Sequence, residues 1–246
     1  MFLEHHVGNI PVIYLDGRLF PDAKLYSEGH LRPTCRGYFH AISCLFLLAA
    51  LGVLLRDCKD SVVGQVVCVV YLSTNLFCYG TSAIYHILSL SPQREIFIQK
   101  LDHCGIPVMS VGTMVPVSVF LLGNIFGTLL IVISTIFCII TCVNIFRNRP
   151  SLIMQMVTAV WWFIPYWYLL YTAMTGFEFF CMVSTIAFKA IGVVIFAHEY
   201  PDPFPTVFGY HEIFHIFVIL GGLCIFLCNW SVIHRFCKLE DYIYMP

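Results

Sequence analysis

The sequence predicts an all-α, polytopic membrane protein, a bundle of seven transmembrane helices with its N terminus in the cytoplasm. Of the 246 residues, 59% are hydrophobic and only 11% are charged, and the mean hydropathy is +0.85. Because soluble domains normally carry about 25% charged residues, lipid rather than water is the expected main solvent. The two other observations are a series of apolar stretches of membrane-spanning length and an uneven distribution of Lys and Arg between their connectors.

Seven apolar stretches reach or approach the roughly 20 residues that a spanning helix needs. We place the spans at residues 38–55, 61–89, 102–122, 124–146, 152–174, 177–197 and 207–233. The connectors between them are short and contain the Pro, Gly and charged residues typical of turns. The chain is therefore predicted to have three parts: a polar N-terminal segment at 1–37, the seven-helix transmembrane domain at 38–235 and a short C-terminal tail at 236–246.

The orientation is predicted from the basic residues in the connectors. With seven spans, eight of these residues lie on the side of the N terminus, namely Arg18, Lys24, Arg32, Arg36, Arg94, Lys100, Arg147 and Arg149. Four lie on the other side, namely Arg56, Lys59, Arg235 and Lys238. Cytoplasmic loops carry the excess of Lys and Arg, so the N terminus is predicted to be cytoplasmic. Lys189 lies inside the sixth span, where its ammonium group is expected to reach toward the nearer interface.

Charge and cysteine content narrow the classes of partner. The net charge is −1, and the chain lacks a basic stripe with interleaved aromatic residues, which argues against a nucleic-acid partner. Membrane lipids are the expected surroundings. The twelve cysteines are scattered and form no C-x-x-C motif. The pairs Cys138 with Cys142 and Cys224 with Cys228 are spaced for metal binding, but buried cysteine usually packs as a small hydrophobe, which is our interpretation here.

Polar residues inside the spans carry the functional information, because each is costly in hydrocarbon unless it is paired or faces a cavity. Ser82 and His86 close the second span, Asp102 and His103 open the third, His211 and His215 open the seventh, and His40 opens the first. In an antiparallel bundle, the end of an even span and the start of an odd span lie at the same membrane face. All these residues are therefore predicted to lie at one level, on the cytoplasmic side.

This convergence predicts a metal site. His211 and His215 are four residues apart, so both imidazoles project from one face of a helix. With His86 they provide three ligands and leave a fourth position open, as in catalytic zinc sites. Asp102 is then the group expected to hydrogen-bond a water molecule there or to accept its proton. Ser82, one turn before His86, is expected to orient a ligand or to contact the Asp102 side chain.

The histidines also allow other interpretations. A single histidine in a membrane helix commonly donates a hydrogen bond between helices or lies at the interface, which is our interpretation of His40 and His103. The run "HEIFH" also matches H-E-x-x-H, the zinc protease motif in which Glu212 would be the general base. Such a protease would need a third ligand from upstream, because Glu240 and Asp241 lie beyond the predicted seventh span.

Three motifs together resemble a known superfamily. "SAIYH" at 82, "KLDHCGI" at 100 followed by "GTMVP" at 112, and "HEIFHIFV" at 211 are similar to the S-x-x-x-H, D-x-x-G and H-x-x-x-H signatures of the progestin and adipoQ receptor superfamily. The "DHC" form and the run "PDPFPTVFGYHEIFH" resemble its hemolysin III branch most closely. The resemblance covers approximately residues 32–235.

The resemblance implies a seven-helix bundle with a cytoplasmic N terminus, opposite in orientation to G-protein-coupled receptors. It also implies a zinc ion held by His86, His211 and His215, with Asp102 holding the zinc-bound water and Ser82 nearby. The superfamily does not require an acidic residue between the two histidines, so Glu212 is expected to be incidental to the chemistry.

The function that the resemblance implies is hydrolysis of a lipid amide or ester, as in ceramidases, with a lipid-like substrate. Two alternatives stay open, since the superfamily also includes receptors and proteins named for pore formation. The first is a receptor for a lipid, steroid or adipokine-type ligand with a structural zinc, and the second is a pore-forming hemolysin. A conduit would need a continuous polar path, whereas the polar residues predicted here cluster at one end of the bundle.

Overall fold

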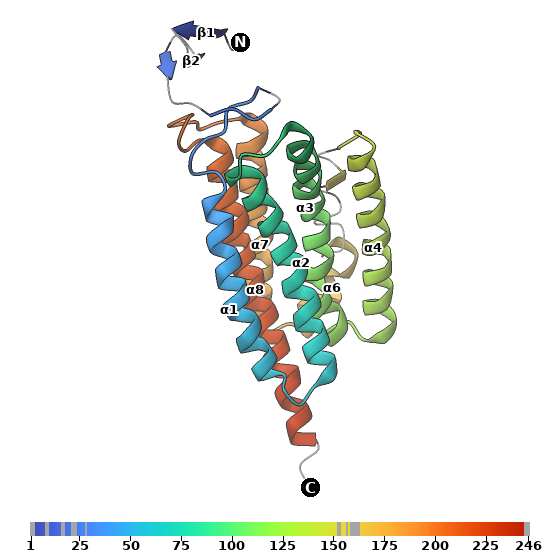
Figure 1. The fold of residues 1–246 in the computed structure, drawn as a ribbon. Coiled ribbons are helices and arrows are strands. Elements are labelled where there is room, and N and C mark those ends of the chain that lie inside the picture. Colours follow the sequence, from blue (N-terminus) through green and yellow to red (C-terminus); the bar gives the residue numbers. More distant parts are fainter. Residues whose placement is uncertain are drawn as a thin grey trace.

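The apolar stretches of the chain form long helices that run side by side in one bundle (Figure 1). The structure, a computed structural model, describes residues 24–27, 29–151, 154, 155, 157 and 163–243, and the backbone of three strands between residues 3 and 20. The helices are α1 (Tyr38–Asp57), α2 (Val62–Ile87), α3 (Pro92–Phe120), α4 (Asn124–Phe146), α6 (Phe163–Ala173), α7 (Gly176–His198) and α8 (Tyr210–Ile243). In lipid a helix satisfies its own backbone hydrogen bonds, which is why such stretches fold this way.

Most predicted spans agree with the helices to within a few residues, and two differ at their ends. The third was predicted to begin at residue 102, but α3 begins at Pro92, because proline is well suited to the first position of a helix. The seventh was predicted to end at residue 233, but α8 continues to Ile243. The predicted fifth span, 152–174, lies partly outside the described residues, and α6 covers its second half.

Six helices of the described part are long and apolar enough to cross a membrane, namely all of those above except α6. Their outward faces carry large exposed apolar side chains, such as Ile42 and Leu45 on α1 and Ile125 on α4. An apolar surface of this extent is unfavourable in water and is what a lipid environment requires. The chain is therefore an integral, multi-pass membrane protein of helical spans.

Three short strands precede the bundle, within the segment that was predicted only as polar. They are β1 (Leu3–Val7), β2 (Ile10–Leu15) and β3 (Arg18–Phe20), and they form an antiparallel sheet in the order β1-β2-β3. The pairs Val7 with Ile10 and Leu15 with Arg18 close two tight hairpins. The helical prediction thus applies to the membrane domain, and the sheet is an addition at its N-terminal side.

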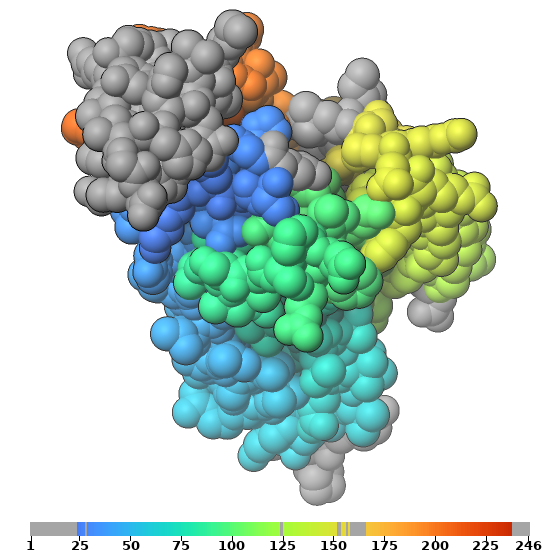
Figure 2. Space-filling model, turned by 45° about the horizontal axis from the view of Figure 1, so that its top comes forward, coloured from blue at the N-terminus to red at the C-terminus, as the bar shows by residue number. Residues whose placement is uncertain are grey.

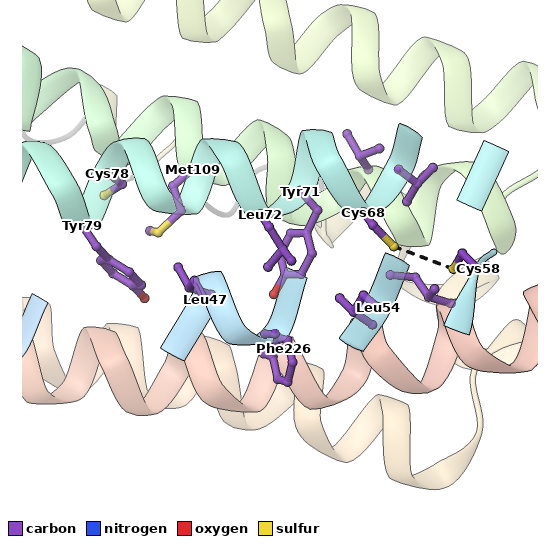
Figure 3. Close-up of a cluster of buried hydrophobic side chains, with 14 of the residues drawn as sticks. Leu47, Leu54, Cys58, Cys68, Tyr71, Leu72, Cys78, Tyr79, Met109 and Phe226 are labelled. Atoms are coloured by element: carbon purple, nitrogen blue, oxygen red, sulfur yellow. Dashed lines mark hydrogen bonds between the residues drawn. The ribbon is translucent and has the colours of Figure 1, made fainter. Parts of the chain in front are cut away.

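The core of the bundle forms around α8, which contacts α1, α3 and α7. One cluster of buried side chains lies between α1, α2 and α8, with Leu54, Tyr71 and Leu72 almost fully buried (Figure 3). A second cluster joins α8 to α3, α4, α6 and α7. Because α8 is packed on several sides, the histidines near its start are held in a fixed position relative to α2 and α3.

Candidate metal centre

The residues predicted to lie at one level do come together at one end of the bundle. α2 ends and α8 begins at the end nearest the N-terminal strands (Figure 1), and these two helix ends carry His86 on one side and His211 and His215 on the other. Asp102 reaches the same level from α3, ten residues after that helix begins at Pro92. The four side chains therefore meet from three different helices.

The three histidines can hold a metal ion. One ligand atom from each of His86, His211 and His215 lies within 4.8 Å of the others. The ring centroid of His86 lies 5.3 Å from that of His211 and 5.4 Å from that of His215. The ring centroids of His211 and His215 are 4.7 Å apart. His86 and His215 are only 5% and 3% exposed. Three imidazoles converging in a buried place match the donor set of an open, four-coordinate zinc site.

A backbone carbonyl fixes the orientation of His215. Its Nδ1 lies 3.2 Å from the carbonyl oxygen of Arg36, in the turn just before α1. A carbonyl oxygen only accepts, so Nδ1 carries the proton and donates it. The lone pair is then on Nε2, which leaves that nitrogen able to bind a cation. This is the arrangement in which a hydrogen bond to one ring nitrogen prepares the other as a metal ligand.

Tyr26 fixes His86 in a similar way. The Tyr26 hydroxyl oxygen lies 2.5 Å from His86 Nδ1, and Tyr26 is itself buried. Burial, opposed by the charges of Arg36 and Arg32, raises the pKa of Tyr26 to about 12, so the phenol stays neutral at physiological pH. When the hydroxyl oxygen accepts from Nδ1, Nε2 of His86 keeps its lone pair.

That second nitrogen of His86 provides a test of whether the site suits a cation. Nε2 of His86 is buried and lacks a hydrogen-bond partner within the described part of the chain. Buried polar atoms are nearly always satisfied, so an unsatisfied one facing two further imidazoles indicates that something absent from the protein chain completes the site. Borderline-soft Zn²⁺ binds imidazole well, and the donor set therefore fits zinc.

Replacing Tyr26 with phenylalanine is expected to weaken zinc binding about tenfold while leaving the fold intact. Loss of a hydrogen bond that orients a ligand typically costs 10- to 100-fold in metal affinity. Competition with a zinc chelator on purified protein measures this change. Tyr85→Phe is the matched control, because Tyr85 stacks on Tyr26 but its hydroxyl bonds Gln99. Equal affinity in the wild type and the Tyr26 variant would contradict the orienting role.

Asp102 lies beside the histidines and not among them. Its Oδ2 is 3.8 Å from His86 Nε2, and the Ser82 hydroxyl donates a hydrogen bond to its carboxylate. Ser82 is one turn before His86 on α2, and its contact with Asp102 is one of the two roles expected for it. A carboxylate held by a serine at the edge of a buried histidine cluster is placed to accept a proton within the site.

His40 contributes a stacked ring rather than the predicted hydrogen bond. Its imidazole stacks on that of His215, with ring centroids 4.1 Å apart, and also packs against Tyr79. Both ring nitrogens of His40 are buried without a hydrogen-bond partner in the described residues. Of the two roles expected for His40, interhelical donor or interfacial residue, the first is wrong for the described residues, since its ring supports His215 through its face.

Glu212 points away from the histidines and has a structural role. Its Oε1 lies 2.5 Å from Arg36 Nε, and its Oε2 accepts a 2.6 Å hydrogen bond from the backbone N–H of Gly209. The second contact is the reciprocal half of a helix N-cap, made by the third residue of α8. Both carboxylate oxygens are engaged in these contacts, so Glu212 is not placed as the base of an H-E-x-x-H protease. This agrees with the expectation that Glu212 is incidental to the chemistry.

Residues 24–27 and 29–37 cover this end of the bundle and supply the hydrogen bonds to His86 and His215. These residues, the covering segment, lie against the beginning of α3 (Figure 2). Arg32 forms an ion pair of 2.6 Å with Glu95 of α3, and the backbone N–H of Ser27 bonds the same carboxylate. The segment also pairs with the connector before α8, where the N–H groups of Thr34 and Cys35 donate to backbone carbonyls. Together these contacts tie α2, α3 and α8 at the site.

Sequence reasoning missed Tyr26 and Arg36 as parts of the site. Tyr26 is 60 residues from His86, and Arg36 is 176 residues from Glu212. No local pattern links such residues, because their proximity arises when the N-terminal segment folds over the bundle. The charges of Arg36, just before the first span, and of Glu212, inside the seventh, were a usable signal, since an unpaired charge at such a place is costly.

A comparison with family models shows one match over most of the chain. The model of a family described as haemolysin-III related matches residues 29–226. This range begins within the covering segment, before Arg32, and includes all three histidines, the whole of α2 and the first half of α8.

Proposed function

The chain belongs to the haemolysin-III related family, and we propose that it is a zinc-dependent hydrolase that cleaves an amide or ester bond in a membrane lipid. The observation that carries this proposal is the meeting of two buried histidines and one half-buried histidine with a carboxylate, Asp102, whose Oδ2 lies 3.8 Å from Nε2 of His86. A closed structural site would use four protein ligands, whereas three ligands and a neighbouring base are typical of zinc hydrolases. A cytoplasmic N terminus, supported by the distribution of Lys and Arg, is part of the proposal.

His86, His211 and His215 would hold the ion. When bound, zinc supplies Lewis-acid chemistry, since it makes water acidic enough to ionise near pH 7 and polarises a carbonyl group. The protein's contribution is to orient these ligands. Arg36, through its carbonyl oxygen, directs Nε2 of His215 inward, and Tyr26 does the same for His86.

Asp102 is proposed as the proton carrier of the reaction. It takes the proton of the attacking water at its carboxylate and returns it to the amine or alcohol that leaves, so that the carboxylate is regenerated. Ser82 holds the carboxylate through its hydroxyl. The burial of the cluster limits the access of bulk water, which strengthens electrostatic interactions inside the site.

The experiment that tests the proposal combines metal analysis with a lipid assay. Protein purified in detergent is expected to contain one zinc per chain and to release fatty acid from a short-chain ceramide or a lipid ester. Release should stop after the zinc is removed with a chelator and return when zinc is added. Saturable lipid binding without any product would instead support the receptor alternative, with zinc as a structural ion. Purified protein without zinc would overturn the proposal, and ion leakage through reconstituted vesicles would then support the pore.

Glu212→Gln is expected to destabilise the protein without affecting the chemistry. Glu212 is fully buried and Arg36 nearly so, and removing one charge of a buried pair typically costs about 3–5 kcal/mol. Thermal unfolding in detergent measures the loss, with Glu199→Gln, at an exposed position before the same helix, as the control. Turnover per zinc-loaded molecule should remain within about twofold of the wild type. A Glu212→Gln variant that folds normally and binds zinc but has lost turnover would instead support Glu212 as the general base of a protease-type mechanism.

A further inference from the structure

A group of three thiols lies at the opposite end of the bundle from the histidines. Sγ of Cys58 is 3.0 Å from Sγ of Cys237 and 3.8 Å from Sγ of Cys68 (the second contact is drawn in Figure 3). Cys58 follows the last residue of α1, Cys68 is on α2, and Cys237 is near the end of α8. All three are buried.

The backbone around these thiols leaves room for a close approach. Gly64, in the first turn of α2, faces the pair, and a Cβ at that position would lie 2.5 Å from Sγ of Cys237 and 3.0 Å from both Cβ and Sγ of Cys58. Any larger residue would therefore push the two sulfur atoms apart. A cavity of about 280 Å³, lined by residues 56–61 and Cys237, adjoins the pair and gives a small oxidant a route to it.

We infer that Cys58 and Cys237 form a disulfide that fastens the end of α8 to the turn between α1 and α2. Formation of an S–S bond of about 2.05 Å requires the sulfur atoms, now 3.0 Å apart, to close by roughly 1 Å. The two thiols pass two electrons and two protons to a small disulfide-bonded oxidant that enters through the cavity, and the oxidant leaves as two thiols. Cys237 is favoured over Cys68 because it is nearer to Cys58.

The position of the pair in the membrane supports this inference. The turn between α1 and α2 lies at the end of the bundle away from the N-terminal strands (Figure 1). With the N terminus in the cytoplasm, this end faces outward, where disulfides form and persist. Burial raises the pKa of the Cys58 thiol to about 12. A thiol of high pKa is a poor leaving group, so the formed cross-link is slow to reduce, which is typical of a structural disulfide.

The cross-link is tested on protein in its own membranes. Thiols are first blocked with N-ethylmaleimide before lysis, and the protein is then digested without reduction and examined by mass spectrometry. A peptide pair joining Cys58 to Cys237, lost after dithiothreitol, is the expected result. The inference is overturned if both cysteines carry the blocking group, if Cys58 is joined to Cys68, or if the pair is found only in samples lysed without blocking.

Thermal unfolding tests whether the cross-link holds α8. Dithiothreitol should lower the Tm of the wild type by about 5 °C, to the value of Cys237→Ser, which should itself not respond to the reductant. Cys35→Ser, which removes a half-buried thiol at the other end of the bundle, is the control and should keep the full response. A wild type whose Tm is unchanged while its cross-link is reduced would refute the stabilising role.

Discussion

His215→Ala should lose both the bound zinc and all lipid hydrolysis. Three imidazoles are the complete set of protein ligands in the proposed site, so the removal of one leaves two and lowers zinc affinity by several orders of magnitude. His215 is also the histidine whose orientation the structure determines best, since its Nδ1 donates to Arg36. Zinc per chain is measured by mass spectrometry on the purified variant, and fatty-acid release is measured on the same sample.

His234→Ala is the matched control for this experiment. His234 lies on α8 as well, but toward the opposite end, where its Nδ1 is 3.6 Å from a carboxylate oxygen of Asp57. This variant should keep one zinc per chain and wild-type turnover. If His215→Ala retained turnover after losing its zinc, the metal would not take part in the reaction. If it retained the zinc, His215 would not be a ligand.

Asp102→Asn should retain the zinc and lose turnover by about 10²–10⁴-fold. General acid–base catalysis by a positioned side chain contributes a factor of this size, and an amide cannot take up the proton that the carboxylate accepts. The substitution preserves side-chain volume, and the amide can still accept the hydrogen bond from Ser82. Metal content separates this effect from that of His215→Ala, because the two variants differ in zinc while both lose activity.

Ser82→Ala is expected to show a smaller loss of turnover with the zinc unchanged, because Ser82 acts only through Asp102. The proposed division of roles fails if Asp102→Asn loses its zinc, since the carboxylate would then be a fourth ligand of a closed site. It also fails if Asp102→Asn retains full turnover, since another group would then carry the proton. A closed site would favour the receptor with a structural zinc.

The positions of the histidines, Asp102 and Ser82 were predictable from two regularities. One is the periodicity of the helix, and the other is that odd and even spans begin at opposite faces of the membrane. His211 and His215 are related by a helical turn, and Ser82 and His86 have the same spacing. The level shared by α2, α3 and α8 follows from counting antiparallel helices, so Asp102 was also expected there. These relations need only the order of the spans along the chain and their lengths, and the pattern of apolar residues gives both because the thickness of the membrane sets the length of a span.

The surroundings of the site depend on contacts between distant parts of the chain. Tyr26 reaches His86, and Arg36 reaches both His215 and Glu212, only because the segment before α1 folds over the end of the bundle. The stacking of His40 on His215 is of the same kind. Side-chain pairs such as these leave no periodic signal, because each is specified by shape and charge in three dimensions.

The order of apolar and polar residues along the chain is enough to predict that it crosses the membrane repeatedly and that three histidines and one carboxylate share a level. The reason is that lipid demands long apolar helices and makes each polar residue within them conspicuous. Three features emerge only when the chain is folded: Nε2 of His215 keeps its lone pair, Arg36 holds Glu212, and Cys58 lies against Cys237. These are matters of a few ångströms between side chains far apart in the sequence, and packing alone sets them.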